Sequence, residues 1–266
     1  MSSSIWSDVP RRIATIAIGV PIILVILSNQ ITANLFFLGV HLLCCLEWIR
    51  LQPSFSLQEF ALFASLSVAT AHLPQELIPL GLLLSVCMLF LYQFPSPSPH
   101  LLFGMIFLSI PMAAWYMVAF SFRHTVSLLL IVWNCDTGAL VVGRLSRSLG
   151  LPSPQIPWLH QISPAKSLAG IVGGFLFGIV TTMNIPWLWR YFGNDYSNWE
   201  DHTALLGVVL STSAILGDLV ESAVKRTTGR KDSSKLLPGH GGILDRFDSS
   251  FLSVVVYYYW CLQKGN

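Results

Sequence analysis

The sequence predicts an all-α protein, a polytopic bundle of about nine helices that cross a membrane. Hydrophobic residues make up 53% of the 266 positions and charged residues only 11%. The mean hydropathy of +0.64 is also typical of a membrane protein. Eight apolar stretches have about 17 to 25 residues, the length that a helix needs to cross a bilayer, and a shorter ninth stretch follows them.

The apolar stretches are separated by residues that end helices. The segments LQPS, HLPQE, QFPSPSPH and LPSPQIPW combine proline with serine or other turn formers. Arg11 and Arg12 precede the first stretch, as in a signal peptide, but Pro21 interrupts it and no small-residue cleavage site follows, so we expect a retained helix. The expected helices cover residues 13–28, 31–49, 57–73, 78–94, 101–121, 124–142, 168–189, 203–224 and 250–263.

The positions of the basic residues indicate how the helices are oriented. If the N-terminus lies inside and the helices alternate in direction, all of the 15 lysines and arginines except Arg123, Arg190 and Lys264 fall on one face. This asymmetry satisfies the positive-inside rule. We therefore expect an integral membrane protein whose basic face points to the cytoplasm, or to the stroma or matrix in an organelle.

Two other classes of protein are disfavoured by composition. A net charge of +2 is too small to indicate a nucleic-acid partner. The five cysteines lie almost wholly in apolar stretches and show no CxxC or Cys/His spacing, so we expect buried thiols and neither disulfides nor zinc.

Placing a carboxylate inside a membrane-spanning apolar stretch costs free energy, so such residues are candidates for a functional role. Asp136 and Asp218 each stand seven positions before a residue at the basic face, so they are expected about 10 Å beneath it. Asp245 and Asp248 are three residues apart at the start of the last stretch and share one face if the helix has begun there. The alternative is that these aspartates have only a structural role, either as hydrogen-bond partners of neighbouring helices or as negative charges that stabilise a helix N-terminus.

Residues 231–249, KDSSKLLPGHGGILDRFDS, form a charged and glycine-rich segment in this apolar chain, which we call the basic segment. Carboxylates without clustered histidine or cysteine suit Mg²⁺ or Mn²⁺. Lysines and arginines beside them suit a polyphosphate, and the glycines let backbone amides approach phosphate. His240 either donates to such a phosphate or bonds within the turn. The residues thus predict a nucleotide or polyphosphate enzyme with a lipidic partner.

The basic segment and its surroundings resemble the phosphatidate cytidylyltransferases, also called CDP-diacylglycerol synthases. The resemblance covers about residues 130–250 and rests on a long gapped motif from Ser222 to Asp248. Three further pieces agree, namely GDLVES, NCDTGALVVGRLSRSLG and ISPAKSLAGIVGG. The chain departs from the common pattern at Leu140, Ala165 and Ala169, where the family commonly has tyrosine, lysine and glutamate.

The resemblance implies transfer of CMP from CTP to phosphatidic acid, giving CDP-diacylglycerol and pyrophosphate in phospholipid biosynthesis. It implies Mg²⁺ or Mn²⁺ held by Asp218 and Asp245, with Asp136 and Asp248 as a second carboxylate set. The phosphates are then held by Lys225, Arg226, Lys231 and Arg246, and the remaining substrate contacts come from Ser163, Lys166, His240, Gly241 and Gly242. In this scheme residues 1–125 are N-terminal membrane helices and residues 126–266 are catalytic membrane helices of the same continuous bundle.

Three alternatives stay open at this point. A CTP-dependent kinase of a lipid alcohol such as polyprenol or phytol would transfer the γ-phosphoryl group and release CDP. An ion or phosphate transporter would use the buried aspartates as a pathway, although the charges gather at one face. An inactive lipid-binding relative is the third. The sequence leaves the host membrane, the acyl-chain preference and a homodimer undecided.

Overall fold

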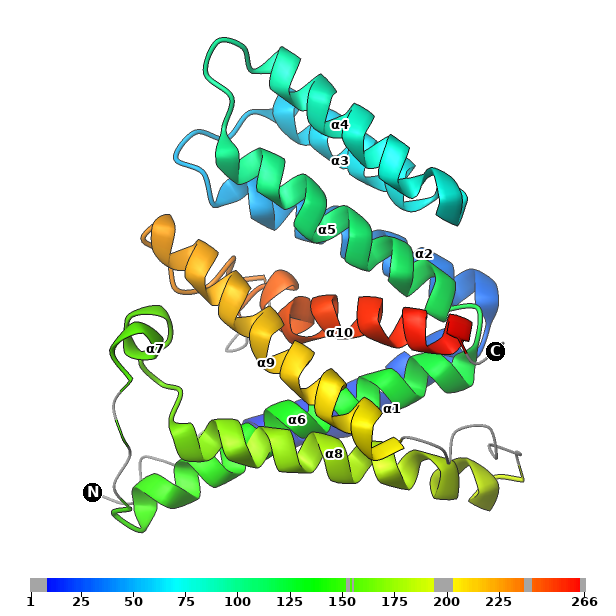
Figure 1. Ribbon diagram of the computed structural model, residues 1–266, viewed down its shortest axis with the longest axis vertical. Helices are drawn as coiled ribbons and strands as arrows, with labels where there is room; N and C mark the ends of the chain where they lie inside the picture. Colours follow the sequence, from blue (N-terminus) through cyan, green and yellow to red (C-terminus); the bar gives the residue numbers. More distant parts are fainter. Residues whose placement is uncertain (1–8, 152–153, 155, 194–202, 237–240, 264–266) are drawn as a thin grey trace. The chain divides into compact units, whose positions relative to one another are not determined.

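The computed structural model describes residues 9–151, 154, 156–193, 203–236 and 241–263, and the side chains of residues 17–262 within these ranges. These residues fold into helices with no β-strand among them (Figure 1). The longer helices are α1 (Val9–Leu27), α2 (Gln30–Arg50), α3 (Leu57–Ala71), α4 (Ile78–Tyr92), α5 (Pro99–Val118), α6 (Phe122–Ser148), α8 (Leu168–Tyr191), α9 (Thr203–Thr227) and α10 (Leu244–Gln263). Two short ones are η2 (Gln75–Leu77) and α7 (Pro157–Ile162).

Each of the nine segments expected from the sequence coincides with one of these helices, so the all-α prediction is confirmed. Six helices in the described part of the chain are long and apolar enough to cross a membrane: α2, residues 75–92, α5, α6, α8 and α9. The number of nine membrane-crossing helices stays a prediction. The largest shifts of a boundary are at the end of α6, which extends to Ser148, and at the start of α10, which begins at Leu244 and therefore includes Asp245 and Asp248.

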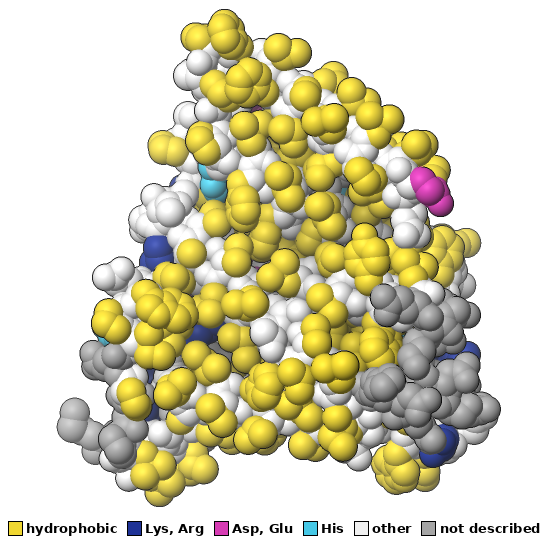
Figure 2. Space-filling view, in the orientation of Figure 1, with side chains coloured by type: hydrophobic (Ala, Val, Ile, Leu, Met, Phe, Trp, Pro, Cys, Tyr) yellow, Lys and Arg dark blue, Asp and Glu magenta, His cyan; other side chains and the backbone are white. Residues whose placement is uncertain are grey.

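Large apolar side chains cover much of the described surface. Only 11% of the apolar window in residues 75–92 is buried, and Leu83 and Leu91 are 60% and 71% exposed. The face in Figure 2 carries mostly hydrophobic side chains. Contiguous apolar surface of this extent is rare on soluble monomers, whereas it suits contact with lipid chains.

The helices form two compact units, each assembled from separated parts of the chain. The first unit comprises Met1–Ala33 and Ser121–Ile215, and the second comprises Asn34–Phe120 and Leu216–Asn266. Two of the boundaries fall within α2 and within α9, and the third falls between α5 and α6. The sequence predicted a different division, between N-terminal helices up to residue 125 and motif-bearing catalytic helices from residue 126. That division stays a prediction.

In the first unit, α6 packs closely against α8 because small residues face each other. A Cβ atom at Gly138 would lie 2.7 Å from the carbonyl oxygen of Gly173, and one at Gly174 would lie 2.8 Å from that of Cys135. Such close backbone approach is how small residues stabilise helix pairs where no hydrophobic effect drives association. These glycines of the two motif pieces therefore have a packing role.

In the second unit, α5 packs against α3, α4 and α10. The ring of Phe37 in α2 stacks on Trp115 in α5 with centroids 4.8 Å apart, and Phe247 of α10 meets Phe37 edge-on at 6.5 Å. Buried hydroxyls add polar links, since Ser67 Oγ lies 2.8 Å from both His41 Nε2 and Ser109 Oγ. Aromatic packing and hydrogen bonds between helices thus hold α10 and α2 beside α5.

We predict that Gly174→Ala destabilises the protein although alanine is the better helix former. The new methyl group meets a backbone carbonyl and forces α6 and α8 apart, at a cost of about 1–3 kcal/mol. Gly39→Ala in α2 is the matched control because its Cβ meets nothing within 4 Å. Thermal unfolding in detergent should show a lower midpoint for Gly174→Ala and an unchanged or higher one for Gly39→Ala. Equal midpoints for the two variants would contradict the packing role.

Candidate active site

The centre of the candidate site is a buried lysine between two carboxylates. Lys225 and Glu221 are one turn apart in α9, with exposed fractions of only 7% and 0%, and their charged groups are in contact. Asp245 at the start of α10 places Oδ1 2.6 Å from the same ammonium. A buried charge is tolerated only when it is paired and hydrogen-bonded, so this arrangement joins α9 to α10.

The Asp245 carboxylate is saturated by donors. Oδ1 accepts from Lys225 Nζ, while Oδ2 accepts from the Gly242 amide at 2.7 Å and from the Ser233 amide and hydroxyl at 3.0 Å each. Burial by itself raises the pKa of Asp245, but the Gly242 amide, Lys225 and the Ser233 amide outweigh it and lower the pKa below its ordinary value. Asp245 therefore fixes both ends of the loop that joins α9 to α10.

Glu47 of α2 is a second buried carboxylate in this network, 3% exposed. Its Oε1 accepts from the Ser234 hydroxyl at 2.7 Å and its Oε2 from the Ser233 hydroxyl at 2.9 Å. The amides of Ile243 and Leu244 also donate to it, at 3.0 and 2.8 Å. These amides have no partner inside α10, so Glu47 caps the N-terminus of that helix from a distant part of the chain.

The glycines of the basic segment make room for these carboxylates. Gly241 has a φ of +80°, and a Cβ there would lie 2.5 Å from Asp245 Oδ2. A Cβ at Gly242 would meet Ser233 Oγ and Glu47 Oε2. Since any side chain at these positions displaces a buried carboxylate, the glycines are required by the fold of the segment itself. Their predicted role in substrate binding stays a prediction, and His240 lies outside the described residues.

Asp218 and Asp248 lie near the close approach of α9 and α10. A Cβ at Gly217 would be 2.5 Å from the carbonyl oxygen of Asp248, so the two helices nearly touch there. Asp218 Oδ1 accepts from the Ser222 hydroxyl at 3.1 Å, and Asp248 Oδ1 accepts from the Ser249 amide at 2.7 Å. Both aspartates thus come from the same helix pair as Lys225 and Asp245.

The cations around this network differ from Lys225 in being exposed. Arg226 donates to the carbonyl oxygen of Arg230 at 3.2 Å, which closes the turn after α9. The exposed basic side chains between the end of α9 and the first turn of α10 are Arg226, Arg230, Lys231, Lys235 and Arg246. They present positive charge to anions in solution, whereas Lys225 is directed into the protein.

Three predicted site residues belong to the first unit. Asp136 is exposed on α6, and Ser163 and Lys166 lie between α7 and α8, where the Lys166 amide donates to the Ser163 carbonyl oxygen at 3.1 Å. Ser167 caps α8 by accepting from the Gly170 amide at 3.1 Å. Because each unit is described by itself, the convergence of these residues with Asp218 and Asp245 stays a prediction.

The donor types of the site suit Mg²⁺, but the described arrangement does not assemble an ion site. No group of three or more histidine, cysteine, aspartate or glutamate side chains is placed to hold a metal ion within the described ranges. The oxygens of Asp245 are occupied by nitrogen and hydroxyl donors. In this arrangement Asp245 positions the loop, and its predicted role as a metal ligand, like those of Asp218, Asp136 and Asp248, stays a prediction.

Glu47 and Glu221 were not among the site residues predicted from the sequence. The signal was present for both, since each is a carboxylate in an apolar stretch, like Asp136 and Asp218. Ser233 carries no signal of its own, because a serine in a polar loop is ordinary. Only the folded chain shows that its hydroxyl bridges Glu47 and Asp245.

Comparisons with known proteins agree with the resemblance. The model of the cytidylyltransferase family matches residues 10–263. A phosphatidate cytidylyltransferase of Staphylococcus epidermidis is 44% identical over 128 residues, which cover 48% of this chain and 44% of its own. The proteins of that name from Synechocystis sp. and Staphylococcus aureus are 40% identical over 134 residues and 45% over 123, covering 48% and 45% of this chain and 40% and 42% of their own. The chain thus aligns with less than half of the length of each of these relatives.

We predict that Glu47→Gln opens the basic segment to proteolysis. An amide nitrogen cannot accept the hydrogen bonds that a carboxylate oxygen accepts, and bonds to a charged group contribute about 1.5–3 kcal/mol. Trypsin in detergent should therefore cleave after Lys231 and Lys235 at least about tenfold faster than in the unaltered chain. Glu76→Gln removes an exposed carboxylate of the same unit and should leave the rate unchanged. An unchanged rate for Glu47→Gln would contradict the capping role.

Proposed function

The chain belongs to the cytidylyltransferase family, and from this premise we propose that it is a membrane enzyme that transfers CMP from CTP to phosphatidic acid. The products are CDP-diacylglycerol, an intermediate for phospholipid biosynthesis, and pyrophosphate. The name of the three relatives supports this choice of substrates. The family motif also falls on the segment where the structure places its buried charge network.

The observation that carries the proposal is the division of charge on this segment. The ammonium of Lys225 is paired inside the protein with the carboxylates of Glu221 and Asp245, and the buried carboxylate of Glu47 accepts hydrogen bonds. The neighbouring cations are exposed, and five of them lie within 21 positions of sequence between residues 226 and 246. A loop that displays several cations suits a ligand with several phosphates.

The chemistry needs few protein groups. An oxygen of the lipid phosphate attacks the α-phosphorus of CTP, and the bond from that phosphorus to the oxygen bridging to the β-phosphate breaks. Pyrophosphate leaves with the electron pair. The attacking phosphate is already an anion, so no general base or covalent intermediate is needed. The protein must hold two anions that repel each other and align them, and Arg226, Lys231 and Arg246 are our candidates for this task.

We further propose that the reaction requires Mg²⁺ or Mn²⁺, as the carboxylate-rich motif suggests. Asp218, Asp245, Asp136 and Asp248 are the candidate ligands. A divalent cation supplies charge neutralisation for the triphosphate when it is bound.

The membrane arrangement forms part of the proposal. All nine expected segments cross the bilayer in this arrangement, and the basic face looks toward the cytoplasm, stroma or matrix. The positive-inside distribution supports the orientation. The exposed leucines of residues 75–92 support contact with lipid.

We expect the purified full chain to convert CTP and phosphatidic acid in the presence of Mg²⁺ into CDP-diacylglycerol and pyrophosphate in equal amounts. The assay uses CTP labelled either in the cytosine ring or at the γ-phosphate. Ring label in the lipid and γ-label in pyrophosphate support the proposal. Release of CDP with γ-label in the lipid would establish a lipid kinase instead. Chelation by EDTA should abolish turnover, and Mg²⁺ should restore it.

We expect Asp218→Asn to lower kcat/KM more than a hundredfold, because loss of one group that holds the metal–triphosphate costs several kcal/mol. The protein should still insert into membranes and unfold at a similar temperature. Glu76→Gln, in the same unit but away from the motif, should keep full activity. If Asp218→Asn retains more than a tenth of the activity, the assignment of Asp218 is wrong.

A further inference from the structure

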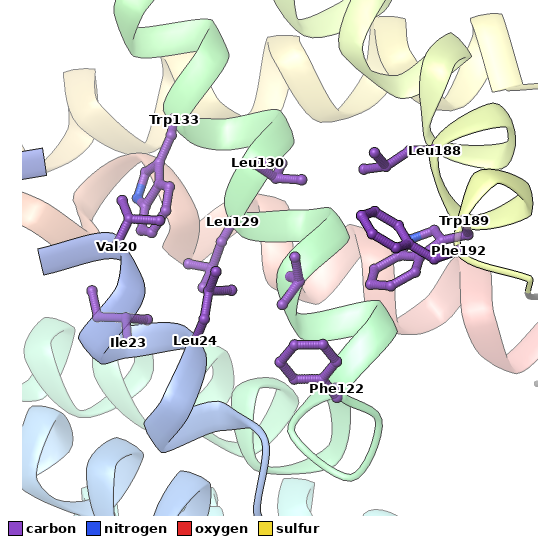
Figure 3. Close-up of a pocket in the computed structure, with 11 residues that line it drawn as sticks. Val20, Ile23, Leu24, Phe122, Leu129, Leu130, Trp133, Leu188, Trp189 and Phe192 are labelled. Carbon is purple, nitrogen blue, oxygen red and sulfur yellow. The ribbon is translucent and has the colours of Figure 1, made fainter. Parts of the chain in front are cut away.

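An apolar pocket of about 400 Å³ lies in the first unit (Figure 3). Its walls come from the second half of α1, the first half of α6 and the end of α8. In the close-up Trp133 lies beside Val20, and Phe122, Trp189 and Phe192 lie together on another wall. The lining consists of Val20, Ile23, Leu24, Phe122, Val126, Leu129, Leu130, Trp133, Leu188, Trp189 and Phe192. The volume is in the range of ligand sites, and the lining offers no charged group.

The depth of the pocket matches one leaflet of a bilayer. On α6 it reaches from Phe122, the first residue of the helix, to Trp133. Eleven residues of helix rise about 16 Å, which is half of a hydrocarbon core of about 30 Å. A lipid chain that enters at the helix end and stops near the midplane would fill this length.

The end of the pocket carries the features of a membrane interface with positive charge. Arg123 and Arg190 directly follow the lining residues Phe122 and Trp189, and both are exposed. Trp187 and Tyr191 are also exposed on the last turns of α8, with ring centroids 6.1 Å apart. Aromatic rings at helix ends mark the level of the lipid headgroups, and arginines there favour an anionic headgroup.

We propose that this pocket binds one anionic glycerophospholipid, with an acyl chain along α6 and its phosphate at Arg123 and Arg190. Arg144 lies at the opposite end of α6, and its 21-residue separation from Arg123 corresponds to about 32 Å of helix. In the predicted topology the headgroup of the bound lipid therefore lies in the leaflet opposite to the basic face, and we assign the lipid a role other than substrate or product. The inference rests on α6 crossing a membrane and not on the proposed chemistry.

An anionic lipid is favoured over other occupants by the combination of shape and charge. A second copy of this chain or an uncharged lipid could cover apolar walls, but neither uses the two exposed arginines that follow lining residues in the sequence. A soluble phosphate compound uses the arginines but not the walls. Only a molecule with a hydrocarbon chain and a phosphate uses both.

The test counts lipids that stay bound to the full chain in native mass spectrometry. The protein is released from nanodiscs that contain equal amounts of dioleoyl-phosphatidylglycerol and dioleoyl-phosphatidylcholine. We expect one retained phosphatidylglycerol and a clear preference for it. The double variant Arg123→Gln with Arg190→Gln should lower this preference at least about tenfold, since each basic group near an anionic surface contributes about 1 kcal/mol. Arg144→Gln with Arg147→Gln, at the other end of α6, is the matched control and should keep it.

A pocket-filling variant tests the chain-binding part independently. Leu130→Trp should reduce retention of both lipids while the thermal unfolding midpoint stays near that of the unaltered chain. If Leu130→Trp lowers that midpoint by more than a few degrees, the smaller change Val126→Leu serves in its place. Equal retention of the two lipids by the unaltered chain overturns the proposal, as does an equal loss of preference in the control. Unchanged retention in the filling variants, or a change in oligomeric state instead of lipid number, overturns it as well.

Discussion

The need to pair or hydrogen-bond every buried charged group governs the structure around the family motif. Lys225 and Glu221 point inward from an apolar helix, and neither is tolerated there alone. Asp245 completes the pair and thereby fixes the start of α10. Glu47 then satisfies the first amides of that helix and the two serines that hold the loop. One network therefore connects α2, α9 and α10, which are far apart in the sequence.

The helices were predictable because the length of an uninterrupted apolar stretch can be read from the sequence and compared with the length that a membrane-crossing helix needs. The boundaries were less predictable at charged ends. The start of α10 lies six residues before the expected position, because Glu47 and the Asp245 carboxylate stabilise a turn that carries little apolar signal. The motif likewise marked Lys225 and Asp245 as important but not as partners, since that relation arises only when α9 and α10 fold together.

The glycines show how one residue type can satisfy two constraints. Gly241 and Gly242 were interpreted from the sequence as a loop for phosphate, and in the fold they leave space for Glu47 and Asp245. Gly138 and Gly174 in the other motif pieces allow α6 and α8 to approach. A motif glycine is therefore weak support for ligand contact until the atoms around its missing side chain are known.

The charge balance of the network gives the exposed cations a structural role in addition to their proposed role in binding phosphate. The network contains the carboxyl groups of Glu47, Glu221 and Asp245 and the ammonium of Lys225, so carboxyl groups are in excess in this buried region. Backbone amides at the N-terminus of α10 compensate part of this excess. The exposed cations at positions 226, 230, 231 and 246 attract the remaining carboxyl groups over a longer distance, and solvent weakens this attraction. Removal of one of these cations therefore changes both the attraction for phosphate and the stability of the loop. A loss of activity assigns that cation to substrate binding only when the basic segment stays resistant to proteolysis.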